Sequence, residues 1–319
     1  MSAPDVDTTR GFLGRTRDIF ARMGRHDLWL SFRSKPVVIV AAIVAGVLIL
    51  SALAAPLIAP HDPYDMASVS LLYAELPPAW VDGGDPAFPL GTDLQGRDML
   101  STILYGSRTS ILVGAAAVAL SLVLGVAAGL VAGYGGGVVD SVLMRIADIQ
   151  LTFPAILIAL LFDGVVSAIF SHGSSDQYAL LVIILAIGVS NWVLFARVVR
   201  SSTLVEKGKD YVKAARVTGV SSLAILLKHI LPNTLGPVLV IATINLALAI
   251  LGEATLSFLG VGLPPTQPSL GTLIRIGNEY LFSGAWWMTI FPGVTLILLV
   301  LSVNLLGDWL RDALNPKLR

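Results

Sequence analysis

The histidines, carboxylates and serines of this 319-residue chain are the side chains that could perform catalysis or bind a metal. The four histidines (His26, His61, His172 and His229) are far apart, whereas a zinc site needs closely spaced His or Cys, and Cys is absent. The sequence also lacks G-x-S-x-G, H-E-x-x-H and the phosphate loop G-x-x-x-x-G-K-[ST]. We therefore predict no catalytic residue, no metal site and no ATP site. An intramembrane hydrolase remains an alternative, which cleavage of a peptide or lipid by the purified chain would revive.

The composition indicates the class of protein. Hydrophobic residues make up 55% of the chain and charged residues 13%, which is roughly half the charged fraction of a soluble domain. The formal net charge is zero, so the basic clusters do not indicate nucleic-acid binding. The composition predicts an all-α membrane protein.

Six segments are long and apolar enough to span a bilayer, which takes about 20 residues. The third is interrupted by charged residues in its first half, and Pro154 should kink it. The predicted spans are 37–58, 109–133, 140–162, 178–199, 235–256 and 286–306.

The orientation follows from the positive charges, because short loops rich in Lys and Arg stay in the cytoplasm. Of the 21 Lys and Arg residues, 18 lie in the two tails, in the 197–233 segment or at the inner end of the third span. The other three are Arg97, Arg108 and Arg275. Both termini are therefore predicted to be cytoplasmic. Cleavage of the first span as a signal peptide is a weaker alternative, because the basic tail before it is long for a signal sequence.

One polar stretch, YVKAARVTGVSSLAILLKHILPN (211–233), separates two apolar segments. It predicts a short helix with a small face at Ala214 and Ala215, a left-handed turn at Gly219 and a second helix capped by Ser221. The second helix should carry an apolar stripe and stop at Pro232. A membrane-surface helix and packing on the chain's own spans are alternatives. The small face favours docking to a partner protein. The predicted stripe is Leu223, Leu226, Leu227, Ile230 and Leu231.

Three further groups of residues have both a structural and a functional interpretation. Glycines recur every four residues in the second span, which indicates close helix packing and permits sliding. Arg145 and Asp148 can pair on one helical face. Glu253 has no obvious partner, so a contact with another subunit and a place near the outer boundary are both open. The glycine stripe comprises Gly125, Gly129, Gly133 and Gly137.

The outer stretch GTDLQGRDMLSTILYGSRTS (91–110) begins as a turn and becomes amphipathic. It predicts an interfacial helix leading into the second span, or a surface on which something outside the membrane docks. The candidate docking or gating residues are Gly91, Asp93, Gly96, Arg97 and Asp98.

The spacing of Ala214-Ala215, Gly219 and Leu231-Pro232 resembles the "EAA" loop of membrane subunits of bacterial ABC importers. GTDLQGRD, LSFLGVGLPP and NLLGDWLRDALNPKLR are similar to strings of the C-type permeases that import dipeptides and oligopeptides. Together they cover about 91–319 in the expected order. The resemblance implies the type I importer permease fold with six transmembrane helices in the bacterial inner membrane.

The resemblance also implies partners: a second, homologous permease, two cytoplasmic ATPase subunits that hold ATP and Mg, and an external substrate-binding protein. The implied layout is a basic tail (1–36), a first span (37–58), an outer loop (59–106), a permease domain (107–308) with its coupling loop (200–233), and a C-terminal tail (309–319). The implied ATPase-coupling residues are Lys213, Ala214, Ala215, Gly219, Ser221, His229, Leu231 and Pro232.

One residue departs from the family pattern. Lys213 occupies the family's acidic position, so the ATPase is expected to present an acidic residue there. The implied substrate is a dipeptide or oligopeptide, with nickel or another small solute as the alternative.

Overall fold

The structure is a computed structural model, and it describes residue 29 and residues 31–64, 70–169 and 175–314. Within these residues the chain is helical, and its β-structure is limited to one isolated bridge between Thr92 and Asp98. The all-α prediction is confirmed for this part of the chain. Most of the predicted basic tail and residues 315–319 lie outside the described residues.

In the described part of the chain, five helices are long and apolar enough to cross a membrane. They correspond to five of the six predicted spans. These helices are α3 (Pro36–Leu53), α5 (Met99–Gly135), α8 (Ser175–Lys207), the continuous helix that ends with α11 (Leu231–Phe258), and α13 (Trp287–Leu314).

The third predicted span is a pair of helices, α6 (Gly137–Thr152) and α7 (Ala155–Ile169), with a bend of 92° between them. The bend lies at Pro154, which removes a backbone donor and forces the preceding residue out of the helical region. Phe153 accordingly has an extended backbone, with φ −93° and ψ 123°. The predicted kink is therefore a full break, and the pair makes a sixth span only if both helices are counted together.

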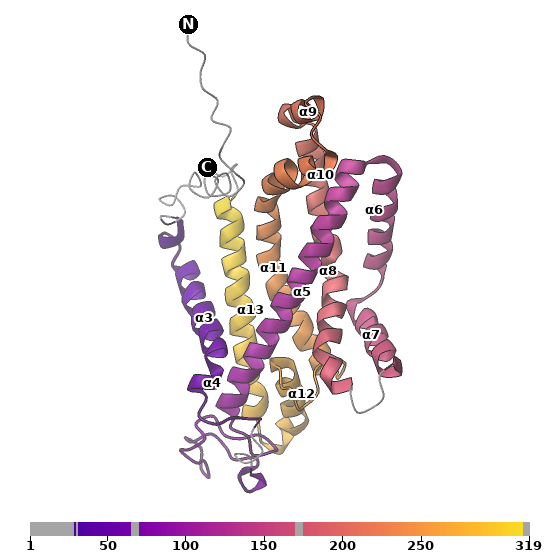
Figure 1. The fold of residues 1–319 in the computed structure, drawn as a ribbon. Helices are drawn as coiled ribbons and strands as arrows, with labels where there is room; N and C mark the ends of the chain where they lie inside the picture. Colours follow the sequence, from indigo (N-terminus) through magenta and orange to yellow (C-terminus); the bar gives the residue numbers. More distant parts are fainter. Residues whose placement is uncertain (1–28, 30, 65–69, 170–174, 315–319) are drawn as a thin grey trace.

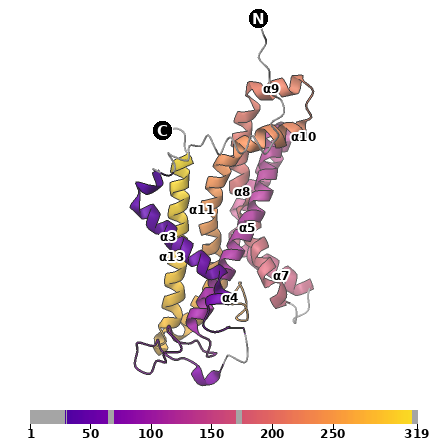
Figure 2. The same cartoon turned by 60° about the vertical axis from the view of Figure 1, so that its left-hand side comes forward.

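The helices form a tilted bundle with distinct ends (Figures 1 and 2). One end carries α9 (Asp210–Val217), α10 (Ser222–Ile225) and the π-helical segment η2 (Leu226–Ile230). The start of α3 and the end of α13 lie at this same end, where Lys35 pairs with Asp312 at 3.1 Å. The positive-inside rule makes this the cytoplasmic end.

The opposite, outer end is formed by short elements and loops (Figure 1). Asp98 caps the start of α5 by accepting a hydrogen bond from the Ser101 backbone at 2.8 Å. The predicted interfacial helix is thus the first part of α5, which runs into the span without a break. The other outer elements are α4 (Ala55–Ile58), η1 (Leu71–Tyr73), α12 (Leu270–Tyr280) and η3 (Leu281–Ser283).

The most extensive helix contact in the bundle joins α5 to α8, and three glycines of α5 permit it. A Cβ atom at Gly125, Gly129 or Gly133 would lie 2.4, 2.6 or 2.7 Å from the nearest atom of α8. Real Cβ contacts are not this short, so the absence of side chains is what allows the two backbones to approach. Gly137 lies outside this stripe: it starts α6 with φ +53°, and a Cβ there would meet nothing within 4 Å.

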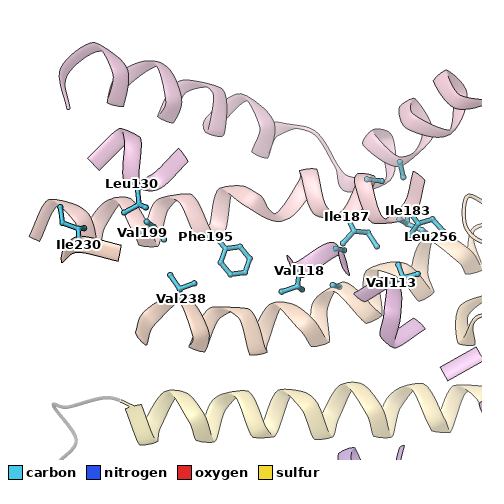
Figure 3. Packing of buried hydrophobic residues seen from close by; sticks show 14 of the residues in the cluster. Val113, Val118, Leu130, Ile183, Ile187, Phe195, Val199, Ile230, Val238 and Leu256 are labelled. Carbon is cyan, nitrogen blue, oxygen red and sulfur yellow. The ribbon is translucent and has the colours of Figure 1, made fainter. Parts of the chain in front are cut away.

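The same contact is reinforced from the α8 side. A Cβ at Gly188 would lie 2.6 Å from Leu120, and the Ser121 hydroxyl donates a 2.8 Å hydrogen bond to the Gly188 carbonyl. Buried side chains from α5, α8 and α11 fill the adjoining core, with Phe195 at its centre (Figure 3). These three helices therefore form the rigid centre of the molecule.

We predict that Gly129→Ala destabilises the protein by about 1–3 kcal/mol, because the new methyl group overpacks a backbone contact that cannot yield cheaply. Gly46→Ala in α3 is the matched control, since a Cβ there meets nothing within 4 Å. Thermal unfolding of the purified protein in detergent measures both variants. Equal midpoints for the two would show that the α5–α8 contact is not tight.

Candidate functional site

Helix α9 projects from the cytoplasmic end of the bundle and exposes most of its surface (Figures 1 and 2). Val212 is fully buried and anchors the helix, whereas Val217 is 89% exposed. Lys213 points into solvent and pairs with Asp210, one turn earlier, at 3.0 Å. An exposed pair of this kind contributes little to stability. The helix therefore presents an apolar and charged surface that the chain itself leaves uncovered.

The turn after α9 is a Schellman motif, as the glycine predicts. Gly219 has φ +79°, the left-handed region in which a side chain is strained. Its N–H donates to the Arg216 carbonyl, and the Val220 N–H donates to the Ala215 carbonyl, both at 3.0 Å. Ser221 then caps α10 by accepting from the Ala224 N–H at 3.4 Å. The turn redirects the chain sharply without leaving these backbone groups unpaired.

The segment after the turn differs from the predicted amphipathic helix. Helix α10 is followed by the π-helical segment η2, and α11 continues from it directly. Pro232 lies in the first turn of α11 and does not end the helix, so this prediction is wrong. Pro is tolerated in the first turn of a helix because the N–H that it lacks would have no helical partner there. The π segment just before Pro232 also changes the hydrogen-bond register.

The predicted apolar stripe divides between two environments. Ile230 is fully buried and joins the main core, and Leu226 and Leu231 pack against it. Leu223 and Leu227, in contrast, are 65% and 46% exposed. The π segment shifts the angular positions of the residues that follow it, so a stripe drawn with helical spacing does not stay on one face. Exposed Leu223 adds to the uncovered apolar surface beside α9.

The predicted coupling residues also separate into two groups. Lys213, Ala214, Gly219 and Ser221 are exposed, so a partner can reach them. Ala215 is half-buried and packs against the chain's own core, and His229, Leu231 and Pro232 are half-buried as well. The second group can position the exposed residues but offers little surface for contact.

A polar network that the sequence did not reveal ties α9 to α8 and α11. Glu206 at the end of α8 accepts hydrogen bonds from Tyr211 and Lys209, both at 2.6 Å. Asn233 donates to the Tyr211 hydroxyl at 3.1 Å and to the His229 carbonyl at 2.8 Å. Burial and the hydrogen bond to Glu206 raise the pKa of Tyr211 to about 12, so its hydroxyl stays protonated and continues to donate.

A second contact joins α9 to the end of α5. The Arg216 guanidinium lies 5.0 Å from the ring centroid of Tyr134, and Lys207 lies 5.5 Å from the same centroid. Lys207 also donates a 2.5 Å hydrogen bond to the Tyr134 carbonyl, and the Tyr134 hydroxyl meets Ser222 at 3.4 Å. Cation–π contacts of this kind stabilise by about 0.5–2 kcal/mol. Tyr134 therefore contacts the start of α10, the end of α9 and the end of α8.

Ion pairs fasten α6 to α8. Arg200 makes a two-pronged contact with Asp140, with N–O distances of 2.5 and 2.6 Å, and this pair is partly buried. Arg197 pairs with Asp148 at 2.7 Å. The predicted pairing of Arg145 with Asp148 is therefore wrong, because α6 lies against α8 and the carboxylate meets an arginine of that neighbouring helix.

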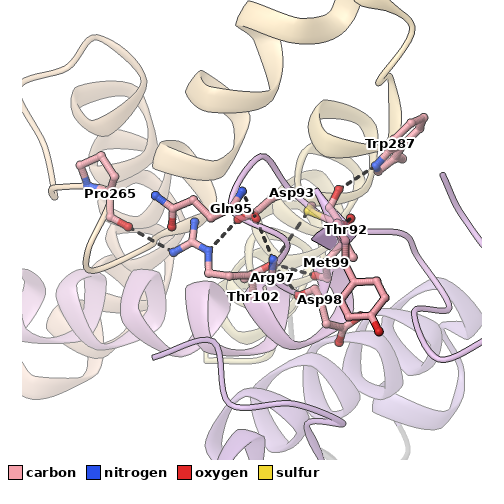
Figure 4. Close-up of polar contacts among 10 residues, drawn as sticks. Thr92, Asp93, Gln95, Arg97, Asp98, Met99, Thr102, Pro265 and Trp287 are labelled. Carbon is pink, nitrogen blue, oxygen red and sulfur yellow. Dashed lines mark hydrogen bonds and ion pairs between the residues drawn. The ribbon is translucent and has the colours of Figure 1, made fainter. Parts of the chain in front are cut away.

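The predicted outer docking residues lie inside the outer loop (Figure 4). Arg97 and Asp93 form a buried pair at 2.7 Å, and Arg97 also donates to the Pro265 carbonyl at 3.4 Å. Gly91 and Gly96 are buried with positive φ and pass close to the backbones of Leu76 and Ser70. Asp98 is buried as well. Buried residues cannot form a docking surface, so the five predicted residues stabilise the fold of the outer loop instead.

Glu253 is fully buried, lies near the outer end and finds its partners within its own chain, so the predicted place near the outer boundary is observed and the contact with another subunit is not. Its carboxyl oxygens accept hydrogen bonds from Ser110 and Ser257, each at 2.7 Å. The Ser110 hydroxyl in turn accepts from the Leu270 N–H at 3.2 Å. The carboxyl group thus links α5, α11 and α12 near the outer end. Among the described residues, no group of three His, Asp or Glu could hold a metal ion.

Comparisons with known proteins agree with this architecture. Residues 125–319 match the family described as binding-protein-dependent transport system inner membrane component. Residues 25–78 match the N-terminal transmembrane domain of oligopeptide transport permease C. The fold is similar to that of a MetNI methionine ABC transporter in inward-facing conformations, with a TM-score of 0.53 and 20% identity over 68% of this chain and 98% of that chain.

Several relatives are similar over nearly their whole length. The dipeptide transport system permease protein DppC of Haemophilus influenzae is 38% identical over 92% of this chain and 95% of its own. The DppC protein of Escherichia coli K12 is 41% identical, with 92% and 93% covered, and the di/tripeptide DppC protein of Pseudomonas aeruginosa is 36% identical, with 92% of each covered. This chain belongs to the family of binding-protein-dependent transport system inner membrane components and is a multi-pass membrane subunit of an ABC importer.

Proposed function

We infer that the chain is a translocation subunit of an ATP-driven importer of dipeptides or oligopeptides. The observation that carries this proposal is the helix α9, which is exposed outside the bundle yet fastened to α5, α8 and α11. The names of the relatives supply the substrate class, because they describe dipeptide and di/tripeptide transport.

The partners in this proposal are a second, homologous permease, two cytoplasmic ATPase subunits and an external substrate-binding protein. ATP and Mg belong to the ATPases, consistent with the lack of a phosphate loop in this sequence. The exposed surface of α9, together with Val217 and Leu223, is the face on which an ATPase docks. The apolar faces of α6, such as Val138 and Val142, suit lipid or the second permease.

Movement of α9 reaches the spans by three routes. Its start continues from α8 and is held by Glu206 and Tyr211, and its end continues through α10 and η2 into α11. The stack of Arg216 on Tyr134 adds the end of α5. When the ATPases close, they shift the population of the permease between inward- and outward-open states, and they do so by binding one position of α9 more tightly than the other.

Uptake of a labelled dipeptide and a labelled tetrapeptide by a strain that lacks this gene tests the substrate class. We expect the wild-type gene to restore accumulation, because the family and the relatives assign import to this chain. A gene that restores neither peptide but restores uptake of nickel would replace the peptide proposal with the metal alternative.

Substitution of Tyr134 tests the mechanical link between α9 and α5. Tyr134→Leu removes the ring beneath Arg216, so transport per ATP hydrolysed should fall about fivefold, as loss of a cation–π contact of about 1 kcal/mol implies. Tyr134→Phe keeps the ring and serves as the matched control. Reconstituted complexes with intact ATPase activity give both rates. A normal transport-to-ATP ratio in Tyr134→Leu would exclude this route.

Charge reversal at Lys213 tests the charge of the ATPase surface that α9 contacts. Lys213→Glu should weaken ATPase binding about tenfold, because it places like charge against the expected acidic residue. Asp210→Asn breaks the Lys213–Asp210 pair but keeps the lysine, and it should bind normally. Co-purification of the ATPases at increasing salt measures both. Stronger binding by Lys213→Glu would mean that the ATPase groove is basic.

A further inference from the structure

An open cavity of about 360 Å³ lies on the outer side of the bundle, between the chain that follows α4 and the outer parts of α5 and α8. Its size falls within the usual range for small-ligand sites. Leu180 belongs to the start of α8, and Arg108 lies nine residues, about 13 Å, from the start of α5. The lining residues are Tyr64, Tyr105, Arg108, Thr109, Leu112 and Leu180.

Arg108 is the charged group of this cavity, and it is exposed. No carboxylate of the described residues pairs with it, whereas Arg97 nearby in sequence has Asp93 as its buried partner. A charged residue on a spanning helix is costly unless it meets water, an opposite charge or a ligand. The guanidinium is therefore free to bind an anion that enters from outside.

The rest of the lining suits an organic anion. Tyr64 and Tyr105 pack edge to face with ring centroids 5.3 Å apart, next to the arginine. Burial raises the pKa of Tyr64, so its hydroxyl stays neutral and does not repel an anion. Leu112 and Leu180 add an apolar wall. The combination of one cation, two phenol groups and an apolar wall matches a carboxylate that carries an apolar side chain.

We propose that this cavity receives the C-terminal carboxylate of the transported peptide, with the Arg108 guanidinium as its direct contact. The planar guanidinium binds a carboxylate through two parallel hydrogen bonds, which a lysine cannot reproduce. The cavity lies at the end where an external binding protein delivers its cargo. This inference rests on the proposed peptide uptake and adds a residue that contacts the substrate.

The test compares a peptide with its C-terminal amide. The complete transporter, with Arg108 or with Arg108→Gln, is reconstituted in vesicles of zwitterionic lipid and supplied with saturating binding protein. We expect Arg108→Gln to slow uptake of the free-acid dipeptide about tenfold, because a charge-assisted contact is lost, and to leave the slower uptake of the amide nearly unchanged. Arg108→Lys should fall between, since it keeps the charge but loses the paired geometry.

Two outcomes would overturn the proposal. If Arg108→Gln slows acid and amide equally, the guanidinium does not contact the carboxylate. If the wild-type rate rises when anionic phospholipid is added to the vesicles and Arg108→Gln removes that rise for both peptides, the cavity holds a lipid headgroup instead.

A third outcome concerns assembly. If the second permease is lost from the purified Arg108→Gln complex, the arginine belongs to the interface between permeases, and the proposal is again wrong. Failure of the peptide function itself looks different, because the wild-type complex would then transport neither the acid nor the amide.

Discussion

The close approach of α5 and α8 is the constraint on which the rest of the structure depends. In a bilayer, lipid tails are as apolar as the helix surfaces, so helices associate through van der Waals contact and hydrogen bonds rather than through exclusion of water. Gly125, Gly129 and Gly133 remove the side chains that would hold these two backbones apart. The resulting rigid pair packs against α11 in the core, and α9 follows directly after α8 in the chain.

Polar groups are placed at the two ends of this rigid pair, where they align the remaining helices. At the cytoplasmic end, Arg197 and Arg200 on α8 hold α6 through two carboxylates. Near the outer end, Glu253 collects hydrogen bonds from serines of two helices. Because an unpaired polar group in a membrane span is costly, each satisfied contact disfavours helix arrangements that would break it.

This arrangement explains how an event at one end of the molecule can be felt at the other. Helix α9 moves against the bundle only by displacing α8, the η2–α11 junction or Tyr134, and each belongs to the packed centre or borders it. The π-helical segment η2 is an irregular part of this route, and such segments often occur where a helix must bend during function. The outer cavity that contains Arg108 is lined by residues of α5 and α8, the two helices of the rigid pair.

The sequence by itself determined the features that depend on neighbouring residues: the spans through their apolar runs, a kink at Pro154, the left-handed turn at Gly219 and the cap at Ser221. Each follows from local sterics or local hydrogen bonds, and the family resemblance rests on the same motifs. Only the tertiary structure decided which residues far apart in the sequence meet. Asp148 pairs with Arg197 from another helix, Glu253 finds Ser110 at a separation of 143 residues, and Tyr134 stacks under Arg216. The outer-loop residues turn inward for the same reason, because burial is a property of the packed helices and not of the local motif.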